Sequence, residues 1–326
     1  MIFGKGIFAA SILCAAGAVQ ACANAPADEM SGSIDPSVDI AALQQNLEKA
    51  RHYDYCSWAY EQGGKALTLP NYDAMLDRET STLSHDERQA TTLLDAGTRI
   101  AQSSKTQKAC VRAFGKGTKT FDKAMKKSLA SHWSKAKYKK SDNKAIASVQ
   151  ESLATHWVED QAARRVYLAS RTEDKTGAEH WTRRLSIITT SQADARSTQY
   201  MRGLLKEYDW IDKTRFGDRV SMAAWLIVQH ADAHVDLQML ALERMESYLE
   251  NGGVSKGNYA FLWDRVAVNS DRQQRYGTQP TWECTPEGTL TLQPLEDPDN
   301  VNARRAAMGL GTVEDGLAGM AKSVCG

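Results

Sequence analysis

Long apolar runs are missing from most of this 326-residue chain. The longest such stretch, Gly6 to Val19, is shorter than the roughly 20 residues that a membrane-spanning helix needs. Proline is also scarce, with seven residues, while helix-favouring Ala, Leu, Lys, Gln, Glu and Arg dominate. These shortages predict a mainly α-helical chain without a confident transmembrane helix.

An excess of charge of one sign is also lacking, because 40 basic residues balance 40 acidic ones. The balance gives the whole chain no attraction to nucleic acid or to membranes. The sequence contains no CxxC pair, phosphate-binding loop, dinucleotide-binding glycine motif, nucleophile elbow, calcium loop or long repeat. No cofactor is therefore expected.

The amino terminus has the features of an export signal. Lys5 precedes the apolar stretch, and small residues follow it, which predicts a signal peptide over 1–23. Val19-Gln-Ala-Cys22 resembles a lipobox, whose cysteine would be acylated, while cleavage after Ala23 or Ala25 is the alternative. A flexible tether is expected over 24–37. Either route predicts an exported protein, in the periplasm or lipid-anchored in the cell envelope.

Four cysteines remain after the signal peptide: Cys56, Cys110, Cys284 and Cys325. An even number in an oxidising compartment predicts two disulfides, and four cysteines allow three connectivities. The pairs Cys56–Cys110 and Cys284–Cys325 are preferred, because each would lie within one predicted domain.

The segment 38–140 is predicted to be a helical domain. Its expected helices cover 41–60, 84–101 and 106–133. Ser84, followed by glutamate three residues later, is typical of a capping box. Gly115 and Gly117 are expected to bend or interrupt the third helix.

This third helix and its extension are strongly basic. Lys105 to Lys140 contains twelve Lys or Arg residues and a single acid, Asp122. One interpretation is a contact with an anionic envelope surface, and the alternative, which the zero net charge favours, is a solvated helix face. Nucleic acid is not an expected partner, because no aromatic platform is interleaved with the cations.

A second helical domain is predicted over 145–326. Its expected helices are 145–170, 178–190, 193–208, 219–249, 256–268 and 301–308. A β-hairpin is expected from 281–285 and 289–295, with its turn at Gly288.

The central candidate region is Trp225 to Gln238, WLIVQHADAHVDLQ. Its four consecutive apolar residues predict a buried helix, in which polar side chains must find partners. On a continuous helix, residues three and four apart share a face. This would group Gln229 with Asp232, and His230 with His234.

The two histidines have the spacing of a metal-binding pair, yet no metal is expected. Ala231 stands where the zinc-protease motif has glutamate, and no third ligand is evident. Hydrogen-bonded histidines are the preferred interpretation. Asp232 cannot face His230 from the same helix, so an orienting carboxylate must come from elsewhere, for instance Asp264.

The loop Gln274 to Gln279, QRYGTQ, is the second candidate region. Its donors and acceptors suit either a polar ligand pocket or a network that fixes the hairpin, and the network is favoured. Arg304 and Arg305 could clamp an anion, but capping helix ends and pairing with Glu296 and Asp297 is preferred.

Several spaced motifs resemble a bacterial domain family of unknown function. The residues that carry the resemblance are Asp160-Gln-x-x-Arg164, Ala224 to Asp232 with Gln238, Asp264-Arg-Val266, Gln274 to Gln279, Glu296-Asp-Pro298 and Asn302-Ala-Arg-Arg305. The resemblance covers about 145 to 318 and implies no established reaction. The family has an acidic or amide residue where His234 stands, which further disfavours a metal.

Three functions are compatible with these patterns. The first is binding of a small polar ligand or a peptide end in a cleft around His230, with Asp160, Arg164, Gln229, Arg265, Gln274, Tyr276 and Gln279 as ligand-binding residues. The second is a hydrolase-like enzyme with His230 as general base and Asp232 and Asp264 as further catalytic candidates. The third is a scaffold that binds other envelope proteins.

Overall fold

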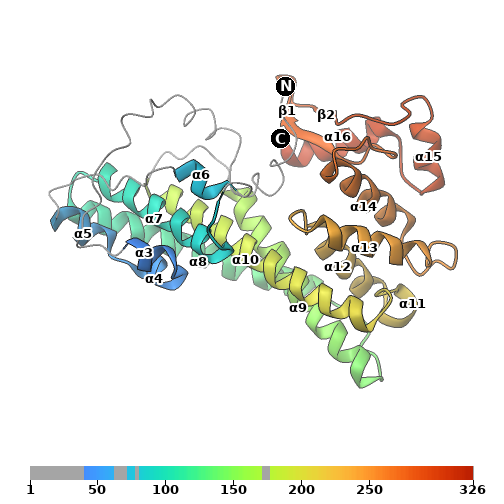
Figure 1. The fold of residues 1–326 in the computed structure, drawn as a ribbon, viewed down its shortest axis with the longest axis horizontal. Coiled ribbons are helices and arrows are strands. Elements are labelled where there is room, and N and C mark those ends of the chain that lie inside the picture. Colours follow the sequence, from blue (N-terminus) through green and yellow to red (C-terminus); the bar gives the residue numbers. More distant parts are fainter. Residues whose placement is uncertain (1–39, 62–71, 78–80, 171–176, 326) are drawn as a thin grey trace. The chain divides into compact units, whose positions relative to one another are not determined.

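The computed structural model describes residues 40–61, 72–77, 81–170 and 177–325, so the predicted signal peptide and tether lie outside the described residues. The described part contains 14 helices and one two-stranded antiparallel hairpin (Figure 1). This composition confirms the predicted mainly α fold class. No helix in the described ranges has the length and apolar character that crossing a membrane requires.

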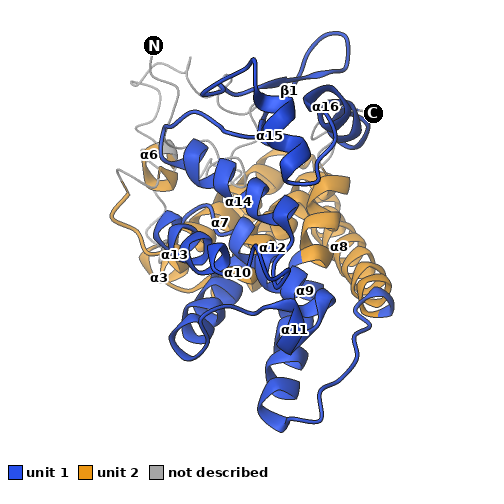
Figure 2. Ribbon diagram, turned by 90° about the vertical axis from the view of Figure 1, so that its right-hand side faces the viewer, with its two compact units in different colours: residues 1–8, 134–160, 194–326 blue, residues 9–133, 161–193 orange. Residues whose placement is uncertain are grey.

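The chain divides into two compact units (Figure 2). Among the described residues, unit 1 contains 134–160 and 194–325, and unit 2 contains 40–133 and 161–193. Three long helices, over residues 107–135, 144–169 and 177–207, therefore contribute residues to both units. The domain boundary that the sequence predicts near 141–144 stays a prediction.

Unit 2 consists of helices packed around one apolar cluster. Its helices are α3 (Ile40–Gln44), α4 (Leu47–His52), α5 (Tyr55–Glu61), α6 (Tyr72–Leu76), α7 (His85–Ser103), most of α8 (Gln107–Lys135) and parts of α9 (Lys144–Ala169) and α10 (Gly177–Glu207). The rings of Tyr55, Phe114 and Trp181 meet in this core, with the Phe114 and Trp181 centroids 4.9 Å apart.

The predicted helix 41–60 is in fact three short helices. The Asn46 side chain accepts a hydrogen bond from the Lys49 amide at 2.9 Å and caps α4. Asp54 accepts from the Ser57 amide at 3.0 Å at the start of α5. Side chains that accept from the backbone in this way favour helix starts over helix interiors. The capping box predicted at Ser84 is present in full, with Glu87 as its partner.

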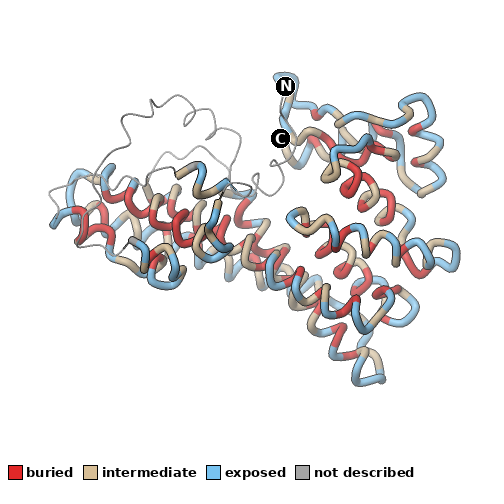
Figure 3. The backbone as a smooth tube through the Cα atoms, in the orientation of Figure 1, coloured by how far each residue is buried: buried red, intermediate tan, exposed pale blue. Residues whose placement is uncertain are grey.

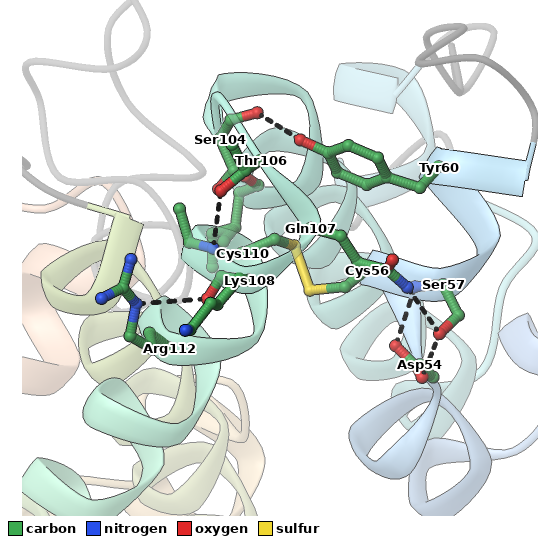
Figure 4. Close-up of a disulfide and its surroundings, with 12 residues drawn as sticks. Asp54, Cys56, Ser57, Tyr60, Ser104, Thr106, Gln107, Lys108, Cys110 and Arg112 are labelled. Carbon is green, nitrogen blue, oxygen red and sulfur yellow. Dashed lines mark hydrogen bonds between the residues drawn. A yellow bond between two sulfur atoms is a disulfide. The ribbon is translucent and has the colours of Figure 1, made fainter.

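Both preferred disulfide pairings are confirmed. Cys56 and Cys110 join α5 to the first turns of α8, with Cα atoms 5.7 Å apart (Figure 4). The Tyr60 hydroxyl adds a hydrogen bond to the Ser104 carbonyl oxygen nearby. The Cys284–Cys325 bond lies in unit 1. By loop-closure entropy, crosslinks at sequence separations of 54 and 41 residues each contribute roughly 4 kcal/mol.

Unit 1 carries the remaining elements. They are α11 (Lys213–Phe216), α12 (Asp218–Gln229), α13 (Val235–Glu246), α14 (Lys256–Asn269), β1 (Pro280–Cys284), β2 (Leu290–Leu292), α15 (Val301–Ala307) and α16 (Val313–Val324). The predicted hairpin is confirmed, and α16 lies beyond the last predicted helix. Figure 3 marks the buried positions along the elements of both units.

Two of the predicted helix boundaries in this part are wrong. The expected break between 190 and 193 does not exist, because α10 is continuous. The hydroxyls of Thr189 and Thr190 donate to carbonyl oxygens four residues earlier, which keeps them compatible with a helix. The expected helix 219–249 is divided into α12 and α13.

The expected bend at Gly115 and Gly117 is also absent, since α8 runs without interruption. Gly117 instead permits a close approach to α10. A Cβ atom there would lie 2.7 Å from the Ala178 carbonyl oxygen and 3.0 Å from the Trp181 ring, while a Cβ at Gly115 would meet nothing within 4 Å. The Thr182 hydroxyl also donates to the Gly117 carbonyl oxygen.

We expect Gly117→Ala to lower the free energy of unfolding by about 1–3 kcal/mol, because the added methyl group meets a backbone oxygen that cannot rotate away. Gly115→Ala is the matched control. It should raise stability by up to about 1 kcal/mol, since alanine is the better helix former in open surroundings. Urea denaturation followed by circular dichroism measures both, and equal effects of the two substitutions would contradict the close α8–α10 contact.

Candidate functional site

Residues 229–232, with the sequence QHAD, lie at the carboxyl-terminal end of α12, and this position determines how their side chains are arranged. His230 is the carboxyl-terminal cap of α12, and His234 is the amino-terminal cap of α13. The side-chain nitrogen Nε2 of Gln238 donates to the carbonyl oxygens of Val228 and Gln229 at 3.2 and 3.4 Å. These hydrogen bonds satisfy carbonyl oxygens at the end of α12 that have no partner within the helix. The shared helix faces expected for 229–238 are therefore not formed.

An Asp–His pair forms beside this helix end. Nδ1 of His230 lies 3.1 Å from both carboxylate oxygens of Asp160, which comes from α9. The Asp160 side chain is 3% exposed and the imidazole 18% exposed. Because an ionised carboxylate only accepts hydrogen bonds, Nδ1 carries the proton in this contact, and in the neutral form of the ring Nε2 is then an acceptor. The carboxylate on His230 is thus Asp160, whereas the sequence suggested Asp264.

Asp232 belongs to a second cluster, between α12, α13 and α14. Its Oδ1 accepts from Asn269 at 3.2 Å and from Gln238 at 3.4 Å, and lies 3.6 Å from Nε of Arg265. Asn269 also donates to Oε1 of Gln238 at 3.0 Å. Asn269 is not among the site residues predicted from the sequence, although its position four residues after Arg265 places both on one face of α14.

Two amide side chains near these helices keep an acceptor without a partner. Oε1 of Gln229 on α12 and Oε1 of Gln279 in the loop are buried and make no hydrogen bond within the described residues. Gln229 is 4% exposed and Gln279 is 1% exposed. The side-chain nitrogen Nε2 of Gln279 donates to the hydroxyl of Thr278 and the carbonyl oxygen of Phe261. Buried acceptors without partners are uncommon, because each costs about 1–3 kcal/mol.

Asp264 holds the QRYGTQ loop. Its carboxylate is fully buried and accepts from the backbone amides of Arg275, Tyr276 and Thr278 at 2.8 to 3.0 Å, and from the Thr278 hydroxyl at 3.0 Å. Burial raises the pKa of the Asp264 carboxyl, against the effect of these four hydrogen bonds. The loop amides that could otherwise bind an external anion are therefore occupied by a side chain of the same protein.

Gln274 fixes the two ends of the same loop to each other and to the hairpin. The fully buried side-chain nitrogen of Gln274, Nε2, donates to the carbonyl oxygens of Gln279 and Gln293. Its Oε1 accepts from the backbone N–H of Gln279 at 2.6 Å. The backbone of Gln274 pairs with Pro294 and Glu296. This arrangement is the hydrogen-bond network that the sequence pattern favours for the loop.

The guanidinium groups around the loop bind its carbonyl oxygens. Arg305 donates to Tyr276, Gly277 and Gly311, and Arg304 donates to the carbonyl oxygens of Arg275 and Asp297. Arg304 also pairs with the Asp297 carboxylate, as preferred from the sequence, whereas Glu296 pairs with Arg275.

Arg275 extends this network on the surface. It pairs with Glu296 at 2.8 Å and stacks over the Trp263 ring at 4.4 Å. Tyr276 contacts the edge of the same ring at a centroid distance of 6.0 Å and is 8% exposed.

The predicted site residues therefore fall into three groups. Asp160 pairs with His230, Asp232 pairs with Arg265, and Asp264 holds the loop that contains Gln274, Tyr276 and Gln279. Arg164 follows on α9 in the segment that belongs to unit 2. Within the described ranges, no group of three or more His, Cys, Asp or Glu side chains is arranged to hold a metal. The ligand-binding and catalytic roles of these residues stay predictions.

A comparison with family models finds one match, described as a family of unknown function, DUF6624, over residues 148–322. It covers the segment of the resemblance noted in the sequence and confirms that part of the prediction. Neither the curated proteins nor the solved structures include a match to this chain.

We expect Asp264→Ala to lower the free energy of unfolding by about 3 kcal/mol or more, because three backbone amides lose their acceptor and each costs about 1–3 kcal/mol. Chemical denaturation measures the change. Asp299→Ala, an exposed aspartate nearby, is the control and should stay within about 0.5 kcal/mol of the wild type. A loss at Asp264 no larger than that at Asp299 would show that the loop does not depend on this carboxylate.

Proposed function

The chain belongs to the DUF6624 family of unknown function, and we propose from its geometry that it binds a small polar ligand beside the carboxyl-terminal end of α12. The observation that carries the proposal is the buried Asp160 carboxylate on Nδ1 of the partly exposed His230 imidazole. This contact fixes both the orientation and the tautomer of the ring. In the proposal, Nε2 accepts a hydrogen bond from the ligand.

The buried oxygens of Gln229 and Gln279 indicate the chemistry of the ligand. Both are acceptors without partners, so they suit a molecule that brings N–H or O–H donors. A buried polar group without a partner within the protein gains most when a ligand supplies one. We therefore propose a ligand rich in donors, such as an amine, an amide or a peptide end.

Asp264 and Gln274 act in this proposal as positioning residues. Their hydrogen bonds hold the loop that contains Tyr276 and Gln279. The Asp232–Arg265 pair has the same role just after the carboxyl-terminal end of α12, where it joins the segment between α12 and α13 to α14.

A hydrolase-like reaction is the second candidate, and the same Asp160 contact favours it. A carboxylate that holds the protonated Nδ1 leaves Nε2 able to take a proton from water or a hydroxyl group, which is the arrangement of a general base. In that case Asp160 orients the ring and stabilises the imidazolium that forms.

The place of action is also a proposal. The signal-like first 23 residues and the two disulfides both suit a protein exported to the periplasm or anchored in the cell envelope by lipid at Cys22. The intact mass of the purified protein tests the anchor, because acylation at Cys22 gives a defined mass increase.

We expect ligands found in a thermal-shift screen of amino acids, short peptides, amines and sugars to bind His230→Ala at least 10-fold more weakly than wild type. Isothermal titration calorimetry measures the affinities. His234→Ala, the histidine four residues away, is the matched control and should bind normally. A ligand that binds wild type and His230→Ala equally well would sink the proposed site, provided that circular dichroism shows both to be folded.

For the hydrolase alternative, we expect Asp160→Asn to lower kcat by about 100-fold or more while KM changes little, since the amide can no longer select the productive ring tautomer. Steady-state kinetics on any ester or amide substrate that the wild type turns over provides the measurement. Turnover that is unchanged in both Asp160→Asn and His230→Ala excludes general-base catalysis by this pair.

A further inference from the structure

Helix α8 carries a continuous basic face in unit 2. Its members are Lys108, Arg112, Lys116, Lys119, Lys123, Lys126 and Lys127, and all seven are exposed. With 100° of rotation per residue, these side chains fall within a sector of about 100°. That sector is opposite the helix positions Cys110, Phe121 and Ser128, which are buried.

The positive charge of this basic face is not neutralised locally. No ion pair joins any of its seven side chains to an acid in the described residues, although other basic residues, such as Arg99 and Arg196, do form such pairs. Asp122 is the only acid on α8, and it lies beside the basic face rather than within it. A solvated basic face is expected to be interrupted by acids, and this one is not.

An aromatic side chain lies at the carboxyl-terminal end of the same surface. Trp133 is 49% exposed and flanks the basic face, on the side where Asp122 also lies. Val111, 54% exposed, lies on that flank near the other end. Exposed tryptophan beside cations is typical of surfaces that contact the headgroup region of a membrane, where its ring has apolar and polar neighbours.

We propose that the basic face of α8 binds the anionic phospholipid headgroups of a membrane surface, with the helix parallel to the membrane plane. The cations from Lys108 to Lys127 extend over about 28 Å along a straight helix, which matches a flat array of phosphates. Each cation near an anionic bilayer strengthens binding by about fivefold. Trp133 inserts between headgroups at the end of the row.

A membrane is favoured over a nucleic acid because of the residue types. Six of the seven cations are lysines, and the single arginine donates from Nε to the carbonyl oxygen of Lys108. Binding to nucleic acids relies heavily on bidentate contacts of arginine to phosphates and, for single strands, on aromatic rings that stack on the bases. The basic face has no aromatic ring between its cations, and its one tryptophan lies at the edge.

Flotation with phospholipid vesicles tests the proposal. The full chain carrying Cys22→Ser, which prevents acylation, is mixed with vesicles of phosphatidylglycerol and phosphatidylcholine or of phosphatidylcholine alone. We expect binding only to the anionic vesicles, with a decrease at higher salt. The triple variant Lys116→Gln, Lys119→Gln, Lys123→Gln should partition about 100-fold less strongly, and Trp133→Ala should lower partitioning several-fold.

The matched control removes three exposed lysines of unit 1, Lys206→Gln, Lys256→Gln and Lys322→Gln, with the same change in net charge. It should bind anionic vesicles like the parent protein. Equal binding by the α8 variant and the control overturns the proposal, as does equal binding to neutral and anionic vesicles. Tighter binding to duplex DNA than to anionic vesicles at the same salt concentration also overturns the membrane assignment. Circular dichroism of each variant verifies folding.

Discussion

The buried carboxylate of Asp264 is the interaction on which the carboxyl-terminal part of unit 1 depends. It collects three backbone amides and one hydroxyl from a loop with little regular structure. Arg305 binds the carbonyl oxygens of the same loop, so donors and acceptors of the backbone are satisfied from opposite sides. A loop without a β ladder needs such partners, because buried backbone groups left unpaired are costly. The fixed loop in turn supports the hairpin through Gln274.

A similar constraint acts at the end of α12. There the Gln238 amide satisfies the last carbonyl oxygens of the helix, and Asn269 connects Gln238 to Asp232. Three helices are thus joined by amide groups rather than by apolar packing alone. Because the helix ends at Gln229, His230 turns toward α9, where Asp160 receives it. An uninterrupted helix would have grouped His230 with His234 instead, as the sequence pattern suggested.

The sequence predicted the features that depend on local signals. Short-range rules predict the capping box at Ser84, the hairpin turn at Gly288 and the mainly helical composition. The disulfide pairing is predicted because each pair lies within one predicted domain. It did not predict where helices break when the cause is distant. Nothing local ends α12, because neither glycine nor proline follows Gln229, and the amide that caps it comes from α13. Likewise the partner of His230 lies 70 residues earlier on α9, at a distance that helical periodicity cannot address.

The distribution of satisfied polar atoms is the main argument for a ligand site. Asp264 and Gln274 use their hydrogen-bonding capacity fully within the protein, so their burial is accounted for by stability. Gln229 and Gln279 do not, since each keeps a buried oxygen without a donor. Each such oxygen costs the protein about 1–3 kcal/mol of desolvation that no hydrogen bond offsets. In the proposed function, a ligand that brings N–H or O–H groups supplies the donors that these two oxygens lack.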